Sequence, residues 1–406
     1  MKNVYIIDEH QSSKQNGIGT YIQQLLLCFR DAEVNVCLLS YNADTETFQI
    51  VKKEYYTEFS IPVCGMGGFL QNGCLSLSLL RLYIQDSSEN VFFVNHSPCK
   101  NFIRTIKKLF PLSLLYFVVH DQGWCAPLLG DFEMLKKIGR GVSRKKWRHI
   151  LNYTKEEKKM YELSNGIIAL SKTTHNIIRD FYRIDAKKIH LIPNGLHLSS
   201  FMVNGCSKET ERVKLGFKPE EKILLYAGRT VRSKGIYALL KAFNYISSNH
   251  KDIRLVIAGQ VLNLNEFTAL TKDCLSHVCY TGLLSKESLY ELYQAADIVI
   301  LPSYTEQSSY TGIEMLAFGK LSIVARGHSL EDMFADNTAI MVSIKDDREN
   351  DDMFASELVK SIERALFMPE RERTTMIQNG RSVYERKYTI RQMSQSYIDL
   401  INRELS

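Results

Sequence analysis

Two glutamates that follow a hydrophobic run could bind a sugar nucleotide. The run at 297–303 is typical of a strand. Glu306 lies in the turn after it, and Glu314 lies in the helix that we expect to begin near Ser309. The first N–H groups of such a helix, at 308–311, have no partner within the helix and attract anions. A diphosphate would suit this helix end, while Glu314 could bind a ribose diol and Glu306 the hydroxyls of a sugar.

A plainer interpretation of this segment is an ordinary capped helix. Ser308 would be its N-cap, Gly319 its C-terminal stop, and both glutamates would be solvated. A second segment favours the chemical interpretation, because Arg229 and Lys234 flank a short loop after the hydrophobic run at 223–228. A basic loop alone is usually only solvated, but guanidinium and ammonium groups at a strand end can share a diphosphate. Together, the segments predict one nucleotide-diphosphate pocket.

Strand-like runs alternate with amphipathic stretches along the chain, a rhythm typical of βαβ units and parallel sheets. The first series of runs lies at 4–8, 36–40, 91–95, 114–120, 166–171 and 189–194. A second series follows a polar stretch at 199–221 and lies at 223–228, 254–259, 277–282, 297–303 and 321–325. The sequence therefore predicts an α/β protein with two doubly wound, Rossmann-like domains and a boundary near residue 200.

The tail of the chain has apolar residues at near-helical spacing from Tyr388 onward. We expect an amphipathic closing helix at 387–406 that belongs to the first domain. The expected domain limits are 1–198 with this helix, and 199–386.

The second half of the chain resembles family 4 of the retaining glycosyltransferases, which have the GT-B fold. The resemblance is strongest across 222–320 and rests on an ordered set of short motifs. These are Gly228-Arg229, Lys234-Gly235, Ala258-Gly259, Thr281-Gly282, Tyr293-Gln294-Ala295-Ala296-Asp297, Pro302-Ser303 and Glu306-x7-Glu314. It implies that the two domains face each other across a cleft, the first binding the acceptor and the second the nucleotide-sugar donor.

The resemblance also implies roles for individual residues. Arg229 and Lys234 would bind the donor diphosphate and Glu314 the ribose. The sugar would contact Glu306 and the turn of Gln307, Ser308, Ser309, Tyr310 and Thr311, and the base would rest near Gly282 and Leu283. The family usually carries glycine or a small apolar residue after the first glutamate. The bulkier, polar Gln307 departs from this pattern, which leaves the identity of the sugar open.

The first half of the chain matches the family more sparsely. Gly17 and Gly19 look like the family's glycine-rich loop, which lets the first helix face the donor phosphates. As a dinucleotide fingerprint the segment fails, because Ile22 stands where a third glycine is needed. His120 ends a strand where the family places a histidine that fixes the sugar near the attacked carbon. His96 has no family match, so we favour a structural role for it over one in an acceptor-side loop at 96–98.

The implied reaction is attack by an acceptor hydroxyl or another nucleophile on the anomeric carbon, with retention of configuration. Arg229 and Lys234 would stabilise the leaving diphosphate, while His120 and Glu306 complete the catalytic set. A hexosyltransferase is the expected kind, with a UDP-sugar favoured and a GDP-sugar as alternative. Because the chain has no Asp-x-Asp motif, we expect neither a metal nor another cofactor.

Two other functions remain open at this point. One is a catalytically silent, glycosyltransferase-like scaffold subunit, which the retained Arg229, Lys234, Glu306 and Glu314 argue against. The other is a GT-B sugar epimerase or phosphorylase, which would keep similar donor chemistry. Addition of a donor without acceptor would separate these from a transferase.

Composition places the chain among ordinary globular proteins. It has 406 residues, 45% hydrophobic and 24% charged, with a net charge of +6 that alone says little about nucleic acid, and we expect none to bind. No signal peptide is recognisable, and the apolar run at 110–119 is shorter than the ~20 residues that a spanning helix needs. Nine unpatterned cysteines suit reduced thiols. We therefore expect a cytoplasmic protein.

The segment 136–149 holds seven Lys or Arg residues and no acidic residue. It could be a solvated loop or helix face. The alternative is a patch that contacts an anionic acceptor or the inner face of an anionic membrane, with Trp147 as interfacial anchor. The acceptor itself, whether a glycan, a lipid-linked sugar or a peptide, is not indicated by the sequence.

Overall fold

The computed structural model describes residues 2–14, 16–63, 69–97, 99–143, 145–198, 207–344 and 351–404. The chain divides into two compact units, Met1–Gly195 with Thr389–Ser406, and Leu196–Tyr388. These limits differ by two or three residues from those expected. The expected boundary at residue 200, and also Pro98 and Arg144, lie outside the described residues.

The first unit is built on a mostly parallel sheet with the strand order β3-β4-β2-β1-β5-β6-β7-β8, in which only the β3–β4 pair is antiparallel. Its strands are β1 (Lys2–Glu9), β2 (Val34–Ala43), β3 (Gln49–Lys52), β4 (Thr57–Pro62), β5 (Asn90–Val94), β6 (Leu114–Val119), β7 (Gly166–Ala169) and β8 (Ile189–Leu191). The central strands are apolar along their length and buried, as in parallel sheets that helices cover on both faces.

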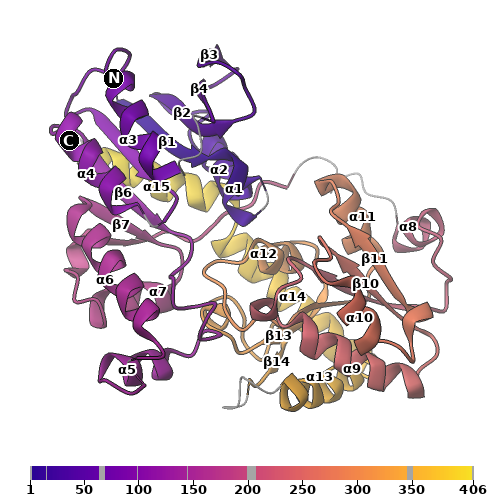
Figure 1. The fold of residues 1–406 in the computed structure, drawn as a ribbon. Helices are drawn as coiled ribbons and strands as arrows, with labels where there is room; N and C mark the ends of the chain where they lie inside the picture. Colours follow the sequence, from indigo (N-terminus) through magenta and orange to yellow (C-terminus); the bar gives the residue numbers. More distant parts are fainter. Residues whose placement is uncertain are drawn as a thin grey trace. The chain divides into compact units, whose positions relative to one another are not determined.

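The helices of the first unit are α1 (His10–Ser13), α2 (Gly17–Cys28), α3 (Phe69–Leu80), α4 (Lys100–Leu109), α5 (Phe132–Gly139), α6 (Arg148–Leu163), α7 (Lys172–Asp180) and α15 (Ile390–Glu404). The expected tail helix is α15, which packs against α2 from the opposite end of the chain (Figure 1). The tail thereby covers the first sheet rather than the second.

The second unit has a parallel sheet with the order β11-β10-β9-β12-β13-β14. Its strands are β9 (Lys222–Ala227), β10 (Ile253–Ala258), β11 (Val278–Gly282), β12 (Ile298–Leu301), β13 (Leu321–Ala325) and β14 (Ile340–Val342). Its helices are α8 (Lys208–Lys214), α9 (Ile236–Asn249), α10 (Leu264–Leu270), α11 (Lys286–Ala295), α12 (Tyr310–Ala317), α13 (Asp351–Leu366) and α14 (Glu370–Lys387). The predicted pair of doubly wound α/β domains is confirmed.

Candidate functional site

The predicted donor residues follow the two strands at which the second sheet reverses its order. β9 and β12 are parallel neighbours, and the chain builds the sheet outward from them in both directions. Ligands of open parallel sheets bind beyond the carboxyl ends of the strands at such a reversal. Arg229 follows β9 and Glu306 follows β12, so the topology itself brings the predicted basic loop beside the predicted acidic turn.

The loop after β9 packs closely on the segment after β12 because residue 235 is a glycine. Gly235 has a φ of +70°, and a Cβ atom there would lie 2.0 Å from the carbonyl oxygen of Pro302. With the loop in this position, Lys234 Nζ lies 2.7 Å from Glu306 Oε1, and the two side chains are 19% and 13% exposed. Two residues that the sequence assigned to one pocket therefore form an ion pair.

Arg229 lies close to the same pair but keeps its charge exposed to solvent. The hydroxyl of Tyr226 donates a hydrogen bond to the Arg229 carbonyl oxygen at 2.6 Å. Burial raises the pKa of Tyr226, the Glu306 carboxylate raises it further, and the Arg229 guanidinium opposes both, so both charges act on one buried phenol. Among the described residues, no carboxylate lies within ion-pair distance of Arg229. Its guanidinium can therefore receive an anionic ligand.

The N-cap of helix α12 is Ser309. The plainer interpretation had assigned this cap to Ser308. Ser309 Oγ accepts a hydrogen bond from the Gly312 N–H at 3.2 Å. The Thr311 hydroxyl donates to the carbonyl oxygen of the last residue of β9 at 3.2 Å. The positive end of α12 is therefore tied to the strand that carries Arg229, where a diphosphate would be bound.

Glu314 is buried within α12, with 1% of its surface exposed. Its Oε1 lies 2.6 Å from Lys286 Nζ, and its Oε2 accepts a hydrogen bond from the Tyr293 hydroxyl at 3.1 Å. The alternative that both glutamates are solvated is therefore wrong. Sequence reasoning missed Lys286, which lies 28 residues from Glu314 in no recognisable motif. Tyr293 stood in the family-like set, but no role was inferred for it.

The remaining predicted donor residues lie along the same edge of the second sheet. Gln307, Ser308, Ser309 and Tyr310 have buried side chains, so their bulk fills the turn between β12 and α12. Gly282 ends β11 with a φ of +71°. Leu283 follows it and is 72% exposed. Leu283 thus offers apolar surface on which the flat face of a base could rest.

In the first unit, His120 follows β6 and is held in one tautomer. Its Nε2 lies 3.1 Å from Asn95 Oδ1, and the Asn95 amide is oriented because its Nδ2 donates to the Ile7 carbonyl at 3.1 Å. This hydrogen-bond pattern assigns the proton to Nε2. Burial and, to a lesser extent, neighbouring His96 together lower the pKa of His120 to about 3, so the ring is neutral at physiological pH. The ring packs edge-on against Tyr21, with 4.4 Å between centroids.

His96 joins the carboxyl ends of β5 and β1. Its Nε2 accepts a hydrogen bond from the Glu9 N–H at 2.9 Å and lies 3.3 Å from Asp8 Oδ1. These contacts lie within one sheet, which supports the structural role favoured for His96.

Gly17 and Gly19 belong to the first turn of α2 and thus lie at the start of the first long helix. Asn16 is the N-cap, and its Oδ1 accepts a hydrogen bond from the Ile18 N–H at 2.8 Å. A Cβ atom on Gly19 would lie 2.5 Å from the Ser13 carbonyl oxygen, so Gly19 lets α1 end against α2. A contact of these glycines with the donor stays a prediction.

Two family models match the chain, one for each unit. The model described as Glycosyltransferase Family 4 matches residues 15–200, and the model described as Glycosyl transferases group 1 matches residues 207–383. The chain belongs to the family 4 glycosyltransferases. The expected family is therefore confirmed over both halves of the sequence.

Curated relatives of this family 4 chain share about a quarter of its residues over the aligned parts. The lipopolysaccharide 1,2-N-acetylglucosaminetransferase of Salmonella typhimurium is 25% identical over 54% of this chain and 58% of its own length. The mannosylfructose-phosphate synthase of Agrobacterium fabrum is 26% identical over 56% of each chain. The chain thus spans little more than half the length of these relatives.

The sucrose-phosphate synthase from Thermosynechococcus elongatus is similar over its whole structure. Its TM-score is 0.77 at 18% identity, and the match covers 99% of both chains. At this identity the likeness shows the fold, and it confirms the predicted GT-B architecture.

The basic segment 136–149 of this family member begins in α5 and ends at the start of α6. Trp147 is partly buried and packs against the hydrophobic core of the first unit, and Lys146 Nζ lies 4.9 Å from its ring centroid. Trp147 therefore already has a structural role, and membrane contact by this segment stays a prediction. None of the helices in the described ranges is both long and apolar enough to span a bilayer.

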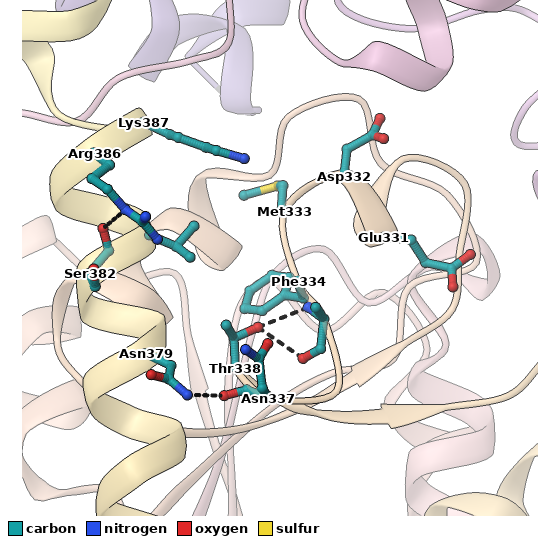
Figure 2. A pocket seen from close by; sticks show the side chains of 12 residues that line it. Glu331, Asp332, Met333, Phe334, Asn337, Thr338, Asn379, Ser382, Arg386 and Lys387 are labelled. Carbon is teal, nitrogen blue, oxygen red and sulfur yellow. Dashed lines mark hydrogen bonds between the residues drawn. The ribbon is translucent and has the colours of Figure 1, made fainter.

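The second unit also has an open pocket of about 350 Å³ between α14 and the loop at 331–338. Figure 2 shows Arg386 and Lys387 on the helix and Glu331 and Asp332 on the loop. No predicted donor residue lines it. Across the described part of the chain, no group of three or more His, Cys, Asp or Glu side chains is arranged to hold a metal ion.

Proposed function

We propose that this protein is a retaining glycosyltransferase that moves a hexose from a nucleoside diphosphate sugar to an acceptor. The proposal rests mainly on the convergence of Arg229, Lys234 and the start of α12 at the reversal of the second sheet, with Glu314 buried in the same helix. Two cationic groups and a helix end suit a diphosphate, and a carboxylate suits the hydroxyls of the attached ribose.

In the proposed reaction, the acceptor attacks the anomeric carbon on the face that the diphosphate leaves. The departing phosphate takes the acceptor proton, so no enzymic nucleophile is needed. Arg229, Lys234 and the end of α12 stabilise the negative charge that develops on the leaving group. Glu306 orients hydroxyls of the transferred sugar, and neutral His120 contacts the sugar from the first unit.

The ion pair of Lys234 and Glu306 supports this assignment of roles. Lys234 Nζ lies 2.7 Å from Glu306 Oε1. A diphosphate would offer Lys234 a second anion, and the Glu306 carboxyl group would then accept hydrogen bonds from hydroxyls of the sugar. Because Arg229 and Lys234 would neutralise the charge of the diphosphate, no metal ion is needed for this purpose. We therefore expect transfer to continue in the presence of a chelator.

The test is a thermal-shift screen of the full chain against nucleotide sugars, with UDP-sugars first and GDP-sugars second. A ligand that binds only the folded state raises the melting temperature. The best donor is then incubated without acceptor, with and without EDTA. Slow, EDTA-resistant hydrolysis supports a transferase, and interconversion of the sugar indicates an epimerase. Phosphate-dependent release of a sugar phosphate indicates a phosphorylase, and no binding at millimolar donor indicates a silent scaffold.

The acceptor class is tested with the same donor. We expect a glycan, a lipid-linked sugar or a peptide, and the donor assay is repeated with a member of each class. Co-sedimentation with neutral and anionic vesicles tests the segment 136–149. Equal partitioning onto both kinds of vesicle would contradict a membrane role for this segment.

A further inference from the structure

The segment that follows β6 rests on one face of α6. Tyr153, Glu157 and Tyr161 are four residues apart and therefore share that face. Glu157 Oε1 accepts a hydrogen bond from the Gly123 N–H at 2.6 Å. A Cβ atom on Gly123 would lie 3.0 Å from the Tyr153 ring, so helix and segment are in direct contact there. The Tyr161 phenol lies beside Gln122, which is fully buried.

Glu157 is a buried carboxylate in the contact between α6 and the segment that follows β6. It is 3% exposed, and its second oxygen accepts a hydrogen bond from the Tyr182 hydroxyl, just past α7. Among the described residues, no lysine or arginine pairs with it. A buried carboxylate without a cationic partner is unfavourable. Its two hydrogen bonds instead join three parts of the unit, which are α6, the end of α7 and the backbone at Gly123.

The connection from Gly123 to His120 is short and stiff. Only two residues separate them, and the Gln122 N–H donates to Asp121 Oδ1 at 2.8 Å. A shift of Gly123 is therefore carried to His120 over a few bonds. On its other side, His120 is held by Asn95 and by the ring of Tyr21.

We propose that Glu157 is a positioning residue, which fixes the segment carrying His120 by binding the Gly123 amide and so sets the rate of sugar transfer. The inference rests on the proposed function, because it takes His120 to contact the donor sugar. Glu157 itself contacts no substrate in this proposal.

The titratable groups around Glu157 are Asp121 and Cys125 on the segment, Tyr161 on its own helix, and Tyr182. The pKa of Glu157 is raised to about 7, because burial and, more weakly, Asp121 raise it by more than the hydrogen bonds from Tyr182 and Gly123 lower it. An ionised carboxylate accepts an amide hydrogen bond more strongly than a protonated one. We therefore expect kcat to rise between pH 6 and pH 8, a range in which His120 does not titrate.

The test compares Glu157→Ala and Glu157→Gln with Glu162→Ala, a control at an exposed position of the same helix. Glu157→Ala should lower kcat about tenfold or more, since small misplacements near the reacting atoms have large effects on rate. It should leave the Kd for UDP unchanged, because the donor residues belong to the other unit. Glu157→Gln can still accept the Gly123 hydrogen bond but carries no charge, so its kcat at pH 8 should lie between those of Glu157→Ala and the wild type, and it should lose the rise between pH 6 and pH 8.

Hydrogen exchange of the backbone at 120–126 provides a readout without activity. Exchange there should speed up in Glu157→Ala. It should speed up more weakly in Tyr182→Phe, which loses only the hydroxyl that donates to Glu157. Wild-type exchange and kcat in both, or an unchanged pH profile in Glu157→Gln, would overturn the proposal. If the wild type processes no nucleotide sugar, the proposed function fails instead, and the exchange data still decide whether Glu157 fixes the segment.

Discussion

Each of the two glutamates of the proposed donor site contacts a lysine in the structure. Lys234 lies 2.7 Å from Glu306, and Lys286 lies 2.6 Å from Glu314. The pairs differ in burial, because Lys234 is 19% exposed whereas Lys286 is 43% exposed. A largely buried ammonium beside a helix end is well placed to hold phosphate, while an exposed one can swing into solvent when a ribose approaches. These differences lead to two separable predictions.

Replacement of Lys234 by methionine should weaken binding of every ligand that carries the diphosphate. Loss of one charge-assisted contact corresponds to about 2 kcal/mol, or roughly thirtyfold in Kd. Isothermal titration with UDP and with inorganic pyrophosphate measures this, and both should lose affinity. Lys241→Met on α9, whose lysine pairs with Asp352, is the control. Wild-type pyrophosphate affinity in Lys234→Met would remove Lys234 from the phosphate site.

Replacement of Glu314 by glutamine should distinguish the nucleoside from the diphosphate. The amide keeps one acceptor oxygen but loses its charge, so UDP affinity should fall by about tenfold. Pyrophosphate lacks the ribose, and its affinity should stay unchanged. Equal losses for both ligands would show that Glu314 acts on the phosphates or on the fold, and the ribose assignment would then be wrong.

Among the helices and strands, those with a clear hydrophobic pattern in the sequence were predicted correctly. The run at 223–228 became β9, the run at 277–282 became β11, and both sheets are parallel where the alternation indicated βαβ units. The antiparallel strand β3 was missed because its residues are all exposed and carry no buried pattern. The Lys286–Glu314 pair was missed for another reason. It depends on how α11 packs beside α12, and no short sequence motif predicts this packing.

The N-cap of α12 should affect both the stability of the protein and its binding of nucleotide. Ser309→Ala removes the acceptor for the Gly312 N–H and should destabilise the protein by about 1 kcal/mol, whereas Ser309→Gly should cost only a few tenths. Urea unfolding of the two variants measures this difference. Since the same helix end is proposed to bind the diphosphate, Ser309→Ala should also weaken UDP binding. A Ser309→Ala variant as stable as the wild type would show that the capping bond contributes nothing.

For the whole molecule, the proposed diphosphate and ribose contacts lie in a different unit from two of the groups whose pKa values are displaced by burial. The proposed diphosphate and ribose contacts lie in the unit Leu196–Tyr388. Glu157 and His120 lie in the other unit, and both have pKa values displaced by burial. Unfolding of a chain with two such units need not be a single transition. Nucleotide should therefore act mainly on the part of the unfolding profile that belongs to the second unit, and the titration of Glu157 on the part that belongs to the first.

The stabilisation that Glu157 gives the first unit should be lost as pH rises through neutrality, whereas His120, whose pKa of about 3 lies below its ordinary value of 6.5, should act in the opposite direction. The pKa of Glu157 is about 7 when folded and near its ordinary value of 4.5 when unfolded, so the folded state binds the proton more tightly. The resulting stabilisation is complete below the ordinary pKa and is lost as pH rises through about 7, in total ~3 kcal/mol. Glu157→Gln is neutral throughout, so its free energy of unfolding should fall less between pH 5 and pH 8, whereas Glu162→Gln should follow the wild type. Calorimetry at these two pH values, with and without UDP, measures both effects, since nucleotide should stabilise the second unit at either pH. A wild-type protein whose stability rises from pH 5 to pH 8, with Glu157→Gln parallel to it, would show that Glu157 is ionised in the folded state over the whole range.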